Sequence, residues 1–264
     1  MSVPPRILIV AGSDSGGGAG LQADLKTVLA LGGYGMTAVT ALTAQNTLGV
    51  HEVLPVPAAF VRRQMRVVLD DLGADAIKTG MLKDADIIAA VADELPAGVP
   101  IVVDPVMVAK GGAALLDPAA IDALRWLLLP RTTLLTPNLP EAEALLGIAI
   151  DDLDGMKRAA EALLAFGPAA ILLKGGHLPG ETVHDVLVDR TGLRVFSAPR
   201  IPSRHTHGTG CTLASALATG LGSGRPLAEA VARARDYVRD AIRAAPGFGR
   251  GHGPLGHGHT VGKF

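Results

Sequence analysis

The chain has 264 residues, 48% of them hydrophobic and 3% aromatic, with one cysteine and a formal net charge of −1. The hydrophobic fraction supports a large buried core, whereas the lack of a basic excess and of aromatic side chains argues against nucleic-acid binding. One cysteine excludes an internal disulfide, and no segment is apolar over the length of a membrane span, so we expect a cytoplasmic protein with no membrane partner.

Short apolar segments alternate with longer helix-like segments. A first strand is predicted at 6–14, and a glycine-rich loop leads from it into a helix. Further strands, rich in Val, Ile and Leu and stopped by Gly or Pro, are predicted at 37–46, 75–81, 100–106, 132–138 and 169–177. Helices are predicted at 58–72, 84–95, 117–128, 140–147 and 154–166. This alternation predicts an α/β fold with a mostly parallel sheet and right-handed crossovers.

The rhythm changes near residues 183–198, where two strands flank Arg190-Thr191-Gly192 and predict an antiparallel hairpin at a sheet edge. Two closing helices are predicted at 209–221 and 226–245, and the Gly- and His-rich tail is expected to be irregular. No linker divides the chain, so we expect one domain spanning 1–264. Three arginines with aspartates between them are typical of an exposed face on the last helix: Arg235, Arg239 and Arg243.

Polar residues stand at the ends of five predicted strands. They are Asp14, Lys78, Asp104, Asn138 and Lys174. Because the carboxyl ends of parallel strands meet at one edge of a sheet, and open α/β folds bind ligands there, we expect these side chains to share a site.

The segment "AGSDSGGGAGLQADLKT" (11–27) follows a strand and enters a helix. It lacks the Lys-Ser/Thr of a Walker A loop, the G-x-G-x-x-G spacing, and an acid near 35–45 that would hold a ribose, which argues against a dinucleotide-binding oxidoreductase. A literal G-x-G-x-x-G in the tail (251–256) has no strand before it and contains Pro254. We interpret 11–27 as a loop that approaches some other ligand closely, and Asp24 by itself as a solvated helix residue.

Two carboxylates follow predicted strands and suit Mg²⁺, which prefers oxygen ligands shared with phosphates. Asp104 ends one strand, and Glu141 stands in the first turn of the helix that Asn138 and Pro140 introduce. An acid that only complements the helix dipole is the alternative for Glu141. Lys174 ends an apolar strand and needs a negative partner, either a phosphate or a structural carboxylate.

The stretch "HTHGTGCTLASALATG" (205–220) places Gly208-Thr209-Gly210 before a helix. Its free N–H groups and the helix dipole predict an anion hole for a phosphoryl group. Cys211 lies in the first turn, where thiol pKa values fall; a buried, purely packing thiol is the alternative. The histidines have no metal-binding spacing, and we interpret them as solvated or supporting residues: His205, His207, His252, His257 and His259.

Together these features predict a kinase-like site without a Walker A loop, rather than a non-catalytic binding protein. The chain resembles the hydroxymethylpyrimidine/phosphomethylpyrimidine kinases, within the ribokinase-like superfamily, over nearly its whole length. The resemblance rests on "AGSDSGGGAGLQADLKT", "TALTAQNTLGV", "IKTGML", "VVDPVMVAKGG", "LLTPNLPEAE", "LLKGGH" and "HTHGTGCTLASALA".

The resemblance implies a three-layer α/β/α fold, usually a homodimer, and ATP-dependent phosphorylation of 4-amino-5-hydroxymethyl-2-methylpyrimidine to the monophosphate and then the diphosphate in thiamine biosynthesis. It implies that the pyrimidine contacts Gly12, Asp24, Gln45 and Val106. Mg²⁺ would be organised by Glu141 with Asn138, beside the Asp104 already considered as a ligand, and ATP would contact Asn138, Lys174 and Thr209. The anion hole would run from Gly208 through Gly210 to Cys211. A pyridoxal kinase is the alternative, because related folds with the same cysteine accept pyridoxal.

The wider superfamily carries an aspartate base where Cys211 stands. We interpret the thiol as a base for the alcohol that does not repel the anionic monophosphate in the second reaction. A scaffold role in the anion hole remains the alternative.

Overall fold

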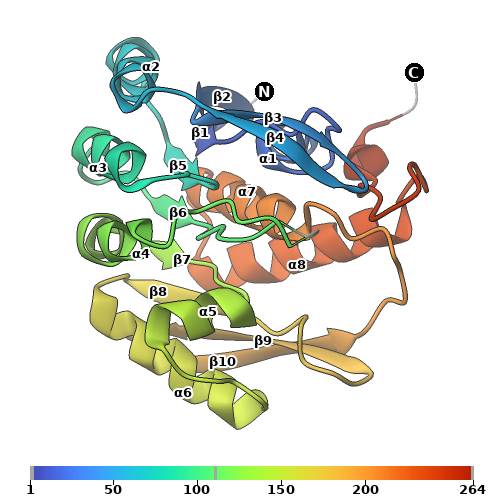
Figure 1. Ribbon diagram of the computed structural model, residues 1–264. Coiled ribbons are helices and arrows are strands. Elements are labelled where there is room, and N and C mark those ends of the chain that lie inside the picture. The colour runs from blue at the N-terminus through green and yellow to red at the C-terminus, as the bar shows by residue number, and fades with distance from the viewer. Residues whose placement is uncertain (1–2, 110–111, 263–264) are drawn as a thin grey trace.

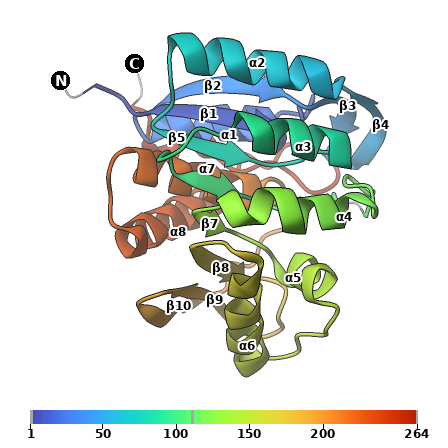
Figure 2. The same cartoon turned by 90° about the vertical axis from the view of Figure 1, so that its left-hand side faces the viewer.

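The computed structural model describes residues 3–109 and 112–262, in which an eight-stranded sheet lies between two layers of helices (Figures 1 and 2). The strand order is β10-β9-β8-β7-β6-β5-β1-β2, and every pair from β8 to β2 is parallel. The strands are β1 (Arg6–Ala11), β2 (Tyr34–Val39), β5 (Ala76–Thr79), β6 (Ile101–Val103), β7 (Leu134–Leu135), β8 (Ala170–Lys174), β9 (Thr182–Asp189) and β10 (Gly192–Pro199).

Two hydrophobic clusters lie on opposite faces of the sheet, and their members alternate along the strands. In β1, Leu8 and Val10 belong to one cluster, while Ile7 and Ile9 belong to the other. The first cluster is covered by α2 (Ala58–Asp71), α3 (Ala85–Glu94), α4 (Ala120–Ala123), α5 (Leu139–Leu146) and α6 (Leu153–Leu163). The second is covered by α1 (Gly20–Ala30), α7 (Thr209–Gly222) and α8 (Leu227–Arg243). This confirms the predicted α/β/α class.

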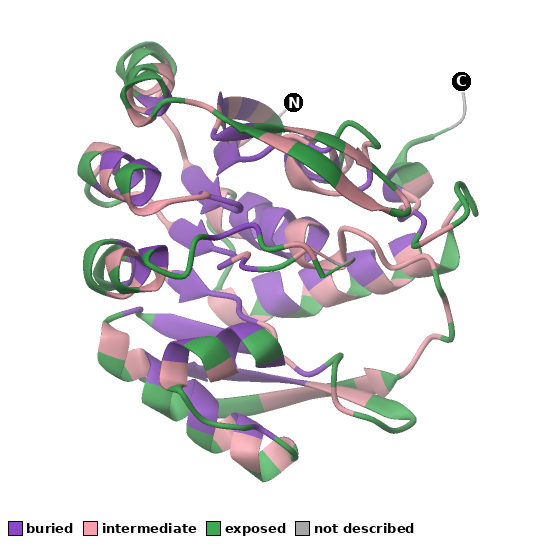
Figure 3. Ribbon diagram, viewed as in Figure 1, coloured by how far each residue is buried: buried purple, intermediate pink, exposed green. Residues whose placement is uncertain are grey.

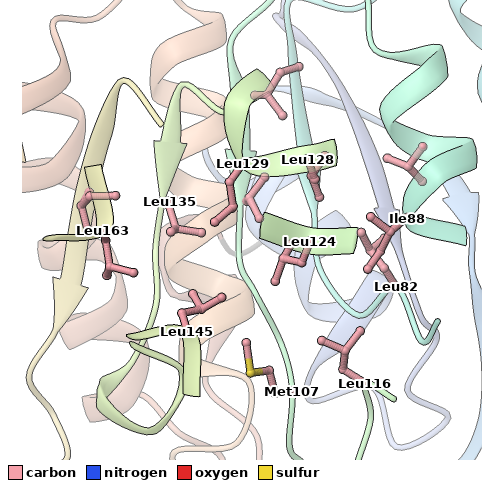
Figure 4. Close-up of a cluster of buried hydrophobic side chains, with 14 of the residues drawn as sticks. Leu82, Ile88, Met107, Leu116, Leu124, Leu128, Leu129, Leu135, Leu145 and Leu163 are labelled. Atoms are coloured by element: carbon pink, nitrogen blue, oxygen red, sulfur yellow. The ribbon is translucent and has the colours of Figure 1, made fainter. Parts of the chain in front are cut away.

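Burial on both faces explains why the central strands are continuous apolar runs. Figure 3 shows these central strands as buried, whereas exposed residues lie on the outer helix faces, in loops, on β10 and on two outlying strands within residues 41–55. Leucine and isoleucine fill the space that aromatic residues occupy in other proteins; Figure 4 shows Leu124, Leu128, Leu135 and Ile88 among the side chains of the first cluster.

The single strand predicted at 37–46 is wrong, because the chain leaves the main sheet at Thr40. The Thr40 N–H donates to the Ala11 carbonyl at the end of β1, and its hydroxyl donates to the Met81 carbonyl at 2.6 Å. Beyond it, β3 (Ala41–Asn46) pairs with β4 (Gly49–Pro55), a strand that the sequence did not indicate, in a separate two-stranded sheet.

The edge hairpin is confirmed: β9 and β10 pair antiparallel around Arg190 and Thr191, and β10 ends the sheet. The helix predicted at 117–128 is only partly α-helical, because α4 continues as a π-helical turn, Leu124–Leu128. No helix in the described ranges is long and apolar enough to cross a membrane.

The C-terminal tail is mostly irregular but firmly attached, and Figure 1 shows it beside the tip of the β3–β4 hairpin. The His252 N–H donates to the Thr47 carbonyl at 2.9 Å, and the His207 N–H donates to the Gly253 carbonyl at 3.2 Å. His257 is buried and lies 3.0 Å from the Thr212 hydroxyl of α7, so it is a supporting residue and not a solvated one, the second of the two roles considered for the histidines.

Candidate active site

A cavity of about 970 Å³ opens at the carboxyl ends of the parallel strands. All five polar residues predicted at the strand ends line it, which confirms that they share one site: Asp14, Lys78, Asp104, Asn138 and Lys174. The β3–β4 hairpin supplies Thr43 and Gln45, and α7 supplies its first turn. The size suits two small molecules or one dinucleotide-sized ligand.

The start of α7 forms one wall of this cavity. Gly208 is the N-cap residue with φ of +82°, and a Cβ there would lie 1.9 Å from the Gly18 carbonyl oxygen, so only glycine fits. The first N–H groups of a helix have no intrahelical acceptor, and here Gly210 and Cys211 lie in the wall of the cavity, while the Thr209 N–H donates to the Thr206 carbonyl at 3.4 Å. The structure therefore supports an anion site at the predicted position.

Lys174 faces this helix start. Its Nζ would lie 3.1 Å from a Cβ placed on Gly210, and it donates to Asp104 Oδ1 at 2.8 Å. Burial lowers the pKa of the Lys174 ammonium, but the carboxylates of Asp104 and Glu141 outweigh burial and raise it. A charged ammonium thus stands between the carboxylates and the anion site.

Glu141 and Asn138 form a capping box at the start of α5. The Asn138 N–H donates to Glu141 Oε2 at 2.8 Å, and the Glu141 N–H donates to Asn138 Oδ1 at 2.9 Å. Burial raises the pKa of Glu141 to about 7, with a further contribution from the charge of Asp104 and an opposing one from Lys174. Glu141 therefore serves the helix and also faces the cavity.

Asp104 and Glu141 already share the Lys174 ammonium as a counter-charge, and Mg²⁺ would add a second positive charge beside these two carboxylates. Within residues 3–109 and 112–262, no group of three or more His, Cys, Asp or Glu side chains could hold a metal ion. A cation here would therefore need ligands from water or a phosphate, as Mg²⁺ accepts.

The expectation of a lowered thiol pKa at Cys211 is wrong. Burial raises the pKa of Cys211 to about 12; the charges of Asp24 and Asp104 add to this, while Lys78 and the Gly20 N–H oppose it. The thiol lies in the cavity wall but remains protonated at neutral pH. The dipole of α7 favours the thiolate, but burial and the two nearby carboxylates together disfavour it more strongly.

Asp24 is not the solvated residue that its position suggested, and it does not line the cavity as the described residues define it. Its two carboxylate oxygens accept from Lys78 Nζ at 2.8 Å and from the Ser215 hydroxyl at 2.7 Å. A direct contact between Asp24 and a ligand is therefore not supported by this geometry. Lys78, which is fully buried yet lines the cavity, stands between them.

The other residues that the resemblance assigns to the pyrimidine line the same cavity. Gly12, Gln45 and Val106 all line the cavity, and a Cβ on Gly12 would lie 2.9 Å from Met81 Sδ. The absence of a side chain at Gly12 thus lets Met81 pack closely against the backbone at the cavity wall. Val106 packs against a small apolar cluster that includes Met81 and Leu115.

Sequence reasoning missed several residues that line the cavity, among them Thr43 and Asp185, and gave His207 only a solvated or supporting role. His207 lies 2.9 Å from Asp14 Oδ2, and its place two residues before the anion-site turn was the available signal. Arg235 and Arg239 were assigned to an exposed helix face, which is wrong: Arg235 Nε donates to Asp185 at 2.7 Å, and both arginines line the cavity. The interleaved aspartates hid this, because they face the other way on the helix.

Comparison with known proteins agrees with the site. Residues 14–256 match the family model for phosphomethylpyrimidine kinase. The hydroxymethylpyrimidine/phosphomethylpyrimidine kinase of Streptomyces coelicolor is 53% identical over 262 residues, which cover 98% of this chain and 97% of that protein. The thiamine biosynthesis bifunctional protein ThiED of Geobacter sulfurreducens is also 53% identical, over 95% of this chain and 52% of its own length.

Among solved structures, a pyridoxal kinase from Staphylococcus aureus in complex with AMP-PCP and pyridoxal has a TM-score of 0.89 at 35% identity, covering 97% of this chain and 94% of that one. The fold is thus shared with pyridoxal kinases, while sequence identity is higher to the pyrimidine kinases. The chain belongs to the phosphomethylpyrimidine kinase family.

Proposed function

We propose that this protein uses ATP to phosphorylate hydroxymethylpyrimidine to its monophosphate and then to its diphosphate, as a step of thiamine biosynthesis. One observation carries the proposal: a single cavity joins an acceptor pocket around Gln45 to an anion site at the start of α7. Both reactions transfer a phosphoryl group onto the same arm of the same ring, so one pocket and one anion site serve both.

At the acceptor end, Gln45 offers a donor and an acceptor to the edge of an aminopyrimidine. Gly12 and Val106 flank it in the cavity wall and would contact the ring. Asp24 would act on the acceptor only through Lys78, since its oxygens are occupied by Lys78 and Ser215.

At the phosphoryl end, Lys174 and the N–H groups of Gly210 and Cys211 would stabilise charge that develops on the transferred group. Asp104 and Glu141 would hold Mg²⁺ through water and phosphate oxygens, and the ion would neutralise charge on the phosphates of ATP. Asn138 lines the same wall and would contact the nucleotide.

The part of the cavity beside the β9–β10 hairpin would hold the adenine ring against apolar side chains from this hairpin, the loop after it and one face of α8. These side chains are Val183, Pro199, Ile201, Val238 and Ile242, and the charged Asp185, Arg200, Arg235 and Arg239 line the same segments. Arg239 closes this part of the cavity by donating to the Pro199 carbonyl at 2.8 Å.

The test is ATP consumption with hydroxymethylpyrimidine, its monophosphate and pyridoxal in parallel. We expect turnover of both pyrimidines and little of pyridoxal; turnover of pyridoxal alone would contradict the proposal. Gln45→Leu should raise the acceptor KM by about 10-fold or more, since it leaves buried polar groups of the ligand unpaired, while the KM for ATP stays constant. An unchanged KM for the acceptor would show that Gln45 does not contact it.

We also propose a homodimer. Large apolar side chains are exposed on the β3–β4 hairpin and on α2, with Leu42 48%, Leu54 61% and Phe60 58% exposed. Light scattering after size exclusion tests it, and Leu54→Asp with Phe60→Asp should give monomers; a wild-type monomer would overturn it.

A further inference from the structure

The backbone of Gln45 is fixed before any ligand binds. The Ser15 hydroxyl accepts from the Gln45 N–H and donates to the Gln45 carbonyl, both at 2.8 Å. The register shift of the β3–β4 hairpin leaves His51 of β4 unpaired and keeps the alternation of β3 intact. Thr43 and Gln45 therefore face the cavity together, while the exposed Ala44 lies on the other side.

His207 must donate a proton toward Asp14. The Asp14 carboxylate is buried, and it already accepts from the backbone N–H groups of Gly16, Gly18 and Ala19 at 2.8–3.1 Å. Although burial raises its pKa, these donors and His207 lower it further, so the group is ionised and can only accept. His207 Nε2, at 2.9 Å, therefore carries a hydrogen.

That hydrogen decides what the Gln45 amide can present to His207. The structure places Gln45 Nε2 3.2 Å from His207 Nε2 and Gln45 Oε1 3.3 Å from Thr43 Oγ1. This orientation sets an amide donor against the His207 N–H. In the reverse orientation, the amide oxygen shares that single hydrogen with Asp14 in a three-centre hydrogen bond.

Thr43 imposes the same choice from the other end of the amide. Its hydroxyl donates its only hydrogen to the Ser13 carbonyl at 2.8 Å, and its oxygen lies 3.3 Å from the second end of the Gln45 amide. Only lone pairs remain on Thr43 Oγ1, so an amide NH₂ is the partner that completes the contact.

A half turn about the last side-chain bond exchanges the amide oxygen and nitrogen without moving the group, so hydrogen bonding selects the orientation. We propose that His207 and Thr43 are specificity-determining positioning residues: they hold the Gln45 amide with Oε1 toward His207 and its NH₂ toward Thr43. This places one amide lone pair on the His207 side of the cavity and one N–H on the Thr43 side.

This inference rests on the proposed function, in which Gln45 contacts the pyrimidine. An aminopyrimidine edge carries an exocyclic amine next to a ring nitrogen that accepts. With its hydroxymethyl arm directed at the start of α7, the ring is held one way round: the amine meets Oε1 and the ring nitrogen meets the amide N–H. The oxo analogue, with a carbonyl in place of the amine and an N–H in the ring, reverses the pattern. Its recognition needs the amide orientation that His207 and Thr43 oppose.

The experiment measures kcat/KM at saturating ATP for hydroxymethylpyrimidine and for its oxo analogue, and compares their ratio among variants. We expect the wild type to prefer the amino compound by at least about 100-fold, as expected where buried polar groups would be left unpaired. Thr43→Val and His207→Leu should each reduce the ratio about tenfold, mainly through the two KM values, because the amide can then turn.

Matched controls keep the hydrogen-bonding atom. Thr43→Ser retains the hydroxyl, and His207→Gln places an N–H near the position of Nε2, so both should keep the wild-type ratio. The inference is overturned if the ratio survives Thr43→Val and His207→Leu, if His207→Gln lowers it as much as His207→Leu, or if the wild type accepts both compounds equally. A wild type that phosphorylates neither pyrimidine would instead overturn the proposed function. Since the two positions are independent, either pair decides the outcome if one variant fails to fold.

Discussion

Lys78 and Asp24 form an ion pair with no solvent exposure at all, with Nζ 2.8 Å from Oδ2. Burial lowers the pKa of Lys78, but the carboxylates of Asp24 and Asp104 outweigh it, so the ammonium stays charged beneath the active-site cavity. The pair joins α1 to β5, and Ser215 of α7 completes it by donating to Asp24.

Asp24→Asn should lower the free energy of unfolding by about 3–5 kcal/mol, because it leaves a buried ammonium without its counter-charge. Lys78→Met combined with Asp24→Asn should recover part of that loss, since no charge then remains to be compensated. Urea denaturation of the two variants measures both effects. If Asp24→Asn is as stable as wild type and only the acceptor KM rises, Asp24 contacts the substrate and our placement is wrong.

Cys211 should resist alkylation. With a pKa of about 12, the thiolate fraction at pH 8 is about 10⁻⁴, far below that of an ordinary thiol. Iodoacetamide labelling followed by mass spectrometry is unambiguous because the chain has one cysteine. Labelling at pH 7.5 as fast as that of free cysteine would contradict the burial effect.

A protonated thiol also predicts similar, modest losses of kcat for Cys211→Ser in the two reactions. A general base would lose about 10²–10⁴-fold with the alcohol alone, because the monophosphate is already charged and needs no base. Steady-state kinetics with the two acceptors separates the outcomes. A loss confined to the alcohol would restore the base hypothesis that the sequence favoured.

Glu141→Gln should raise the Mg²⁺ concentration for half-maximal rate several-fold without unfolding α5, because glutamine can still complete the capping box with Asn138. Glu143→Gln is the matched control: it lies in the same helix and accepts from the Ile150 N–H at 2.8 Å instead of facing the cavity. Titration of Mg²⁺ at fixed ATP measures the difference. If Glu141→Gln melts at a lower temperature than the wild type but needs the same Mg²⁺ concentration, then Glu141 acts only in capping α5 and does not organise Mg²⁺.

His257 should make the protein less stable in acid. Burial, with the charges of Lys26 and His259, lowers the pKa of His257 from 6.5 to about 4. A depressed histidine pKa favours the neutral form in the fold, so its contribution is complete above pH 6.5 and is lost as the pH falls toward 4.

Between pH 7 and pH 4.5 this amounts to about 2 kcal/mol. His257→Gln should remove that part of the pH dependence, whereas His252→Gln, at an exposed position, should not. Denaturant unfolding at the two pH values measures it. Identical pH dependence in wild type and His257→Gln would show that His257 titrates normally.

The sequence predicted the sheet and the edge at which the cavity lies because both depend on short-range patterns. An apolar run stopped by Asp104 or Lys174 identifies a strand and its end. Parallel pairing then brings those ends together whatever the loops do, which is why five strand-end residues were placed correctly.

The features that the sequence did not predict depend on contacts between distant parts of the chain. Thr40 interrupts an unbroken β-like run only because β1 and Met81 take its hydrogen bonds. Asp24 looks like any polar helix residue until Lys78 and Ser215 surround it, and no local pattern indicates either partner. The raised pKa of Cys211 likewise comes from burial and carboxylates that lie elsewhere in the sequence.

The attachment of the tail to the β3–β4 hairpin has a consequence for synthesis on the ribosome. The Gly251 N–H donates to the Thr47 hydroxyl at 3.3 Å, across 204 residues of sequence. The hairpin that carries Gln45 emerges early, but the chain that holds its tip and backs His207 is translated long afterwards. Until those later residues are made, the hairpin tip lacks the N–H donors of Gly251 and His252, and the backbone N–H of His207 lacks the Gly253 carbonyl that accepts from it.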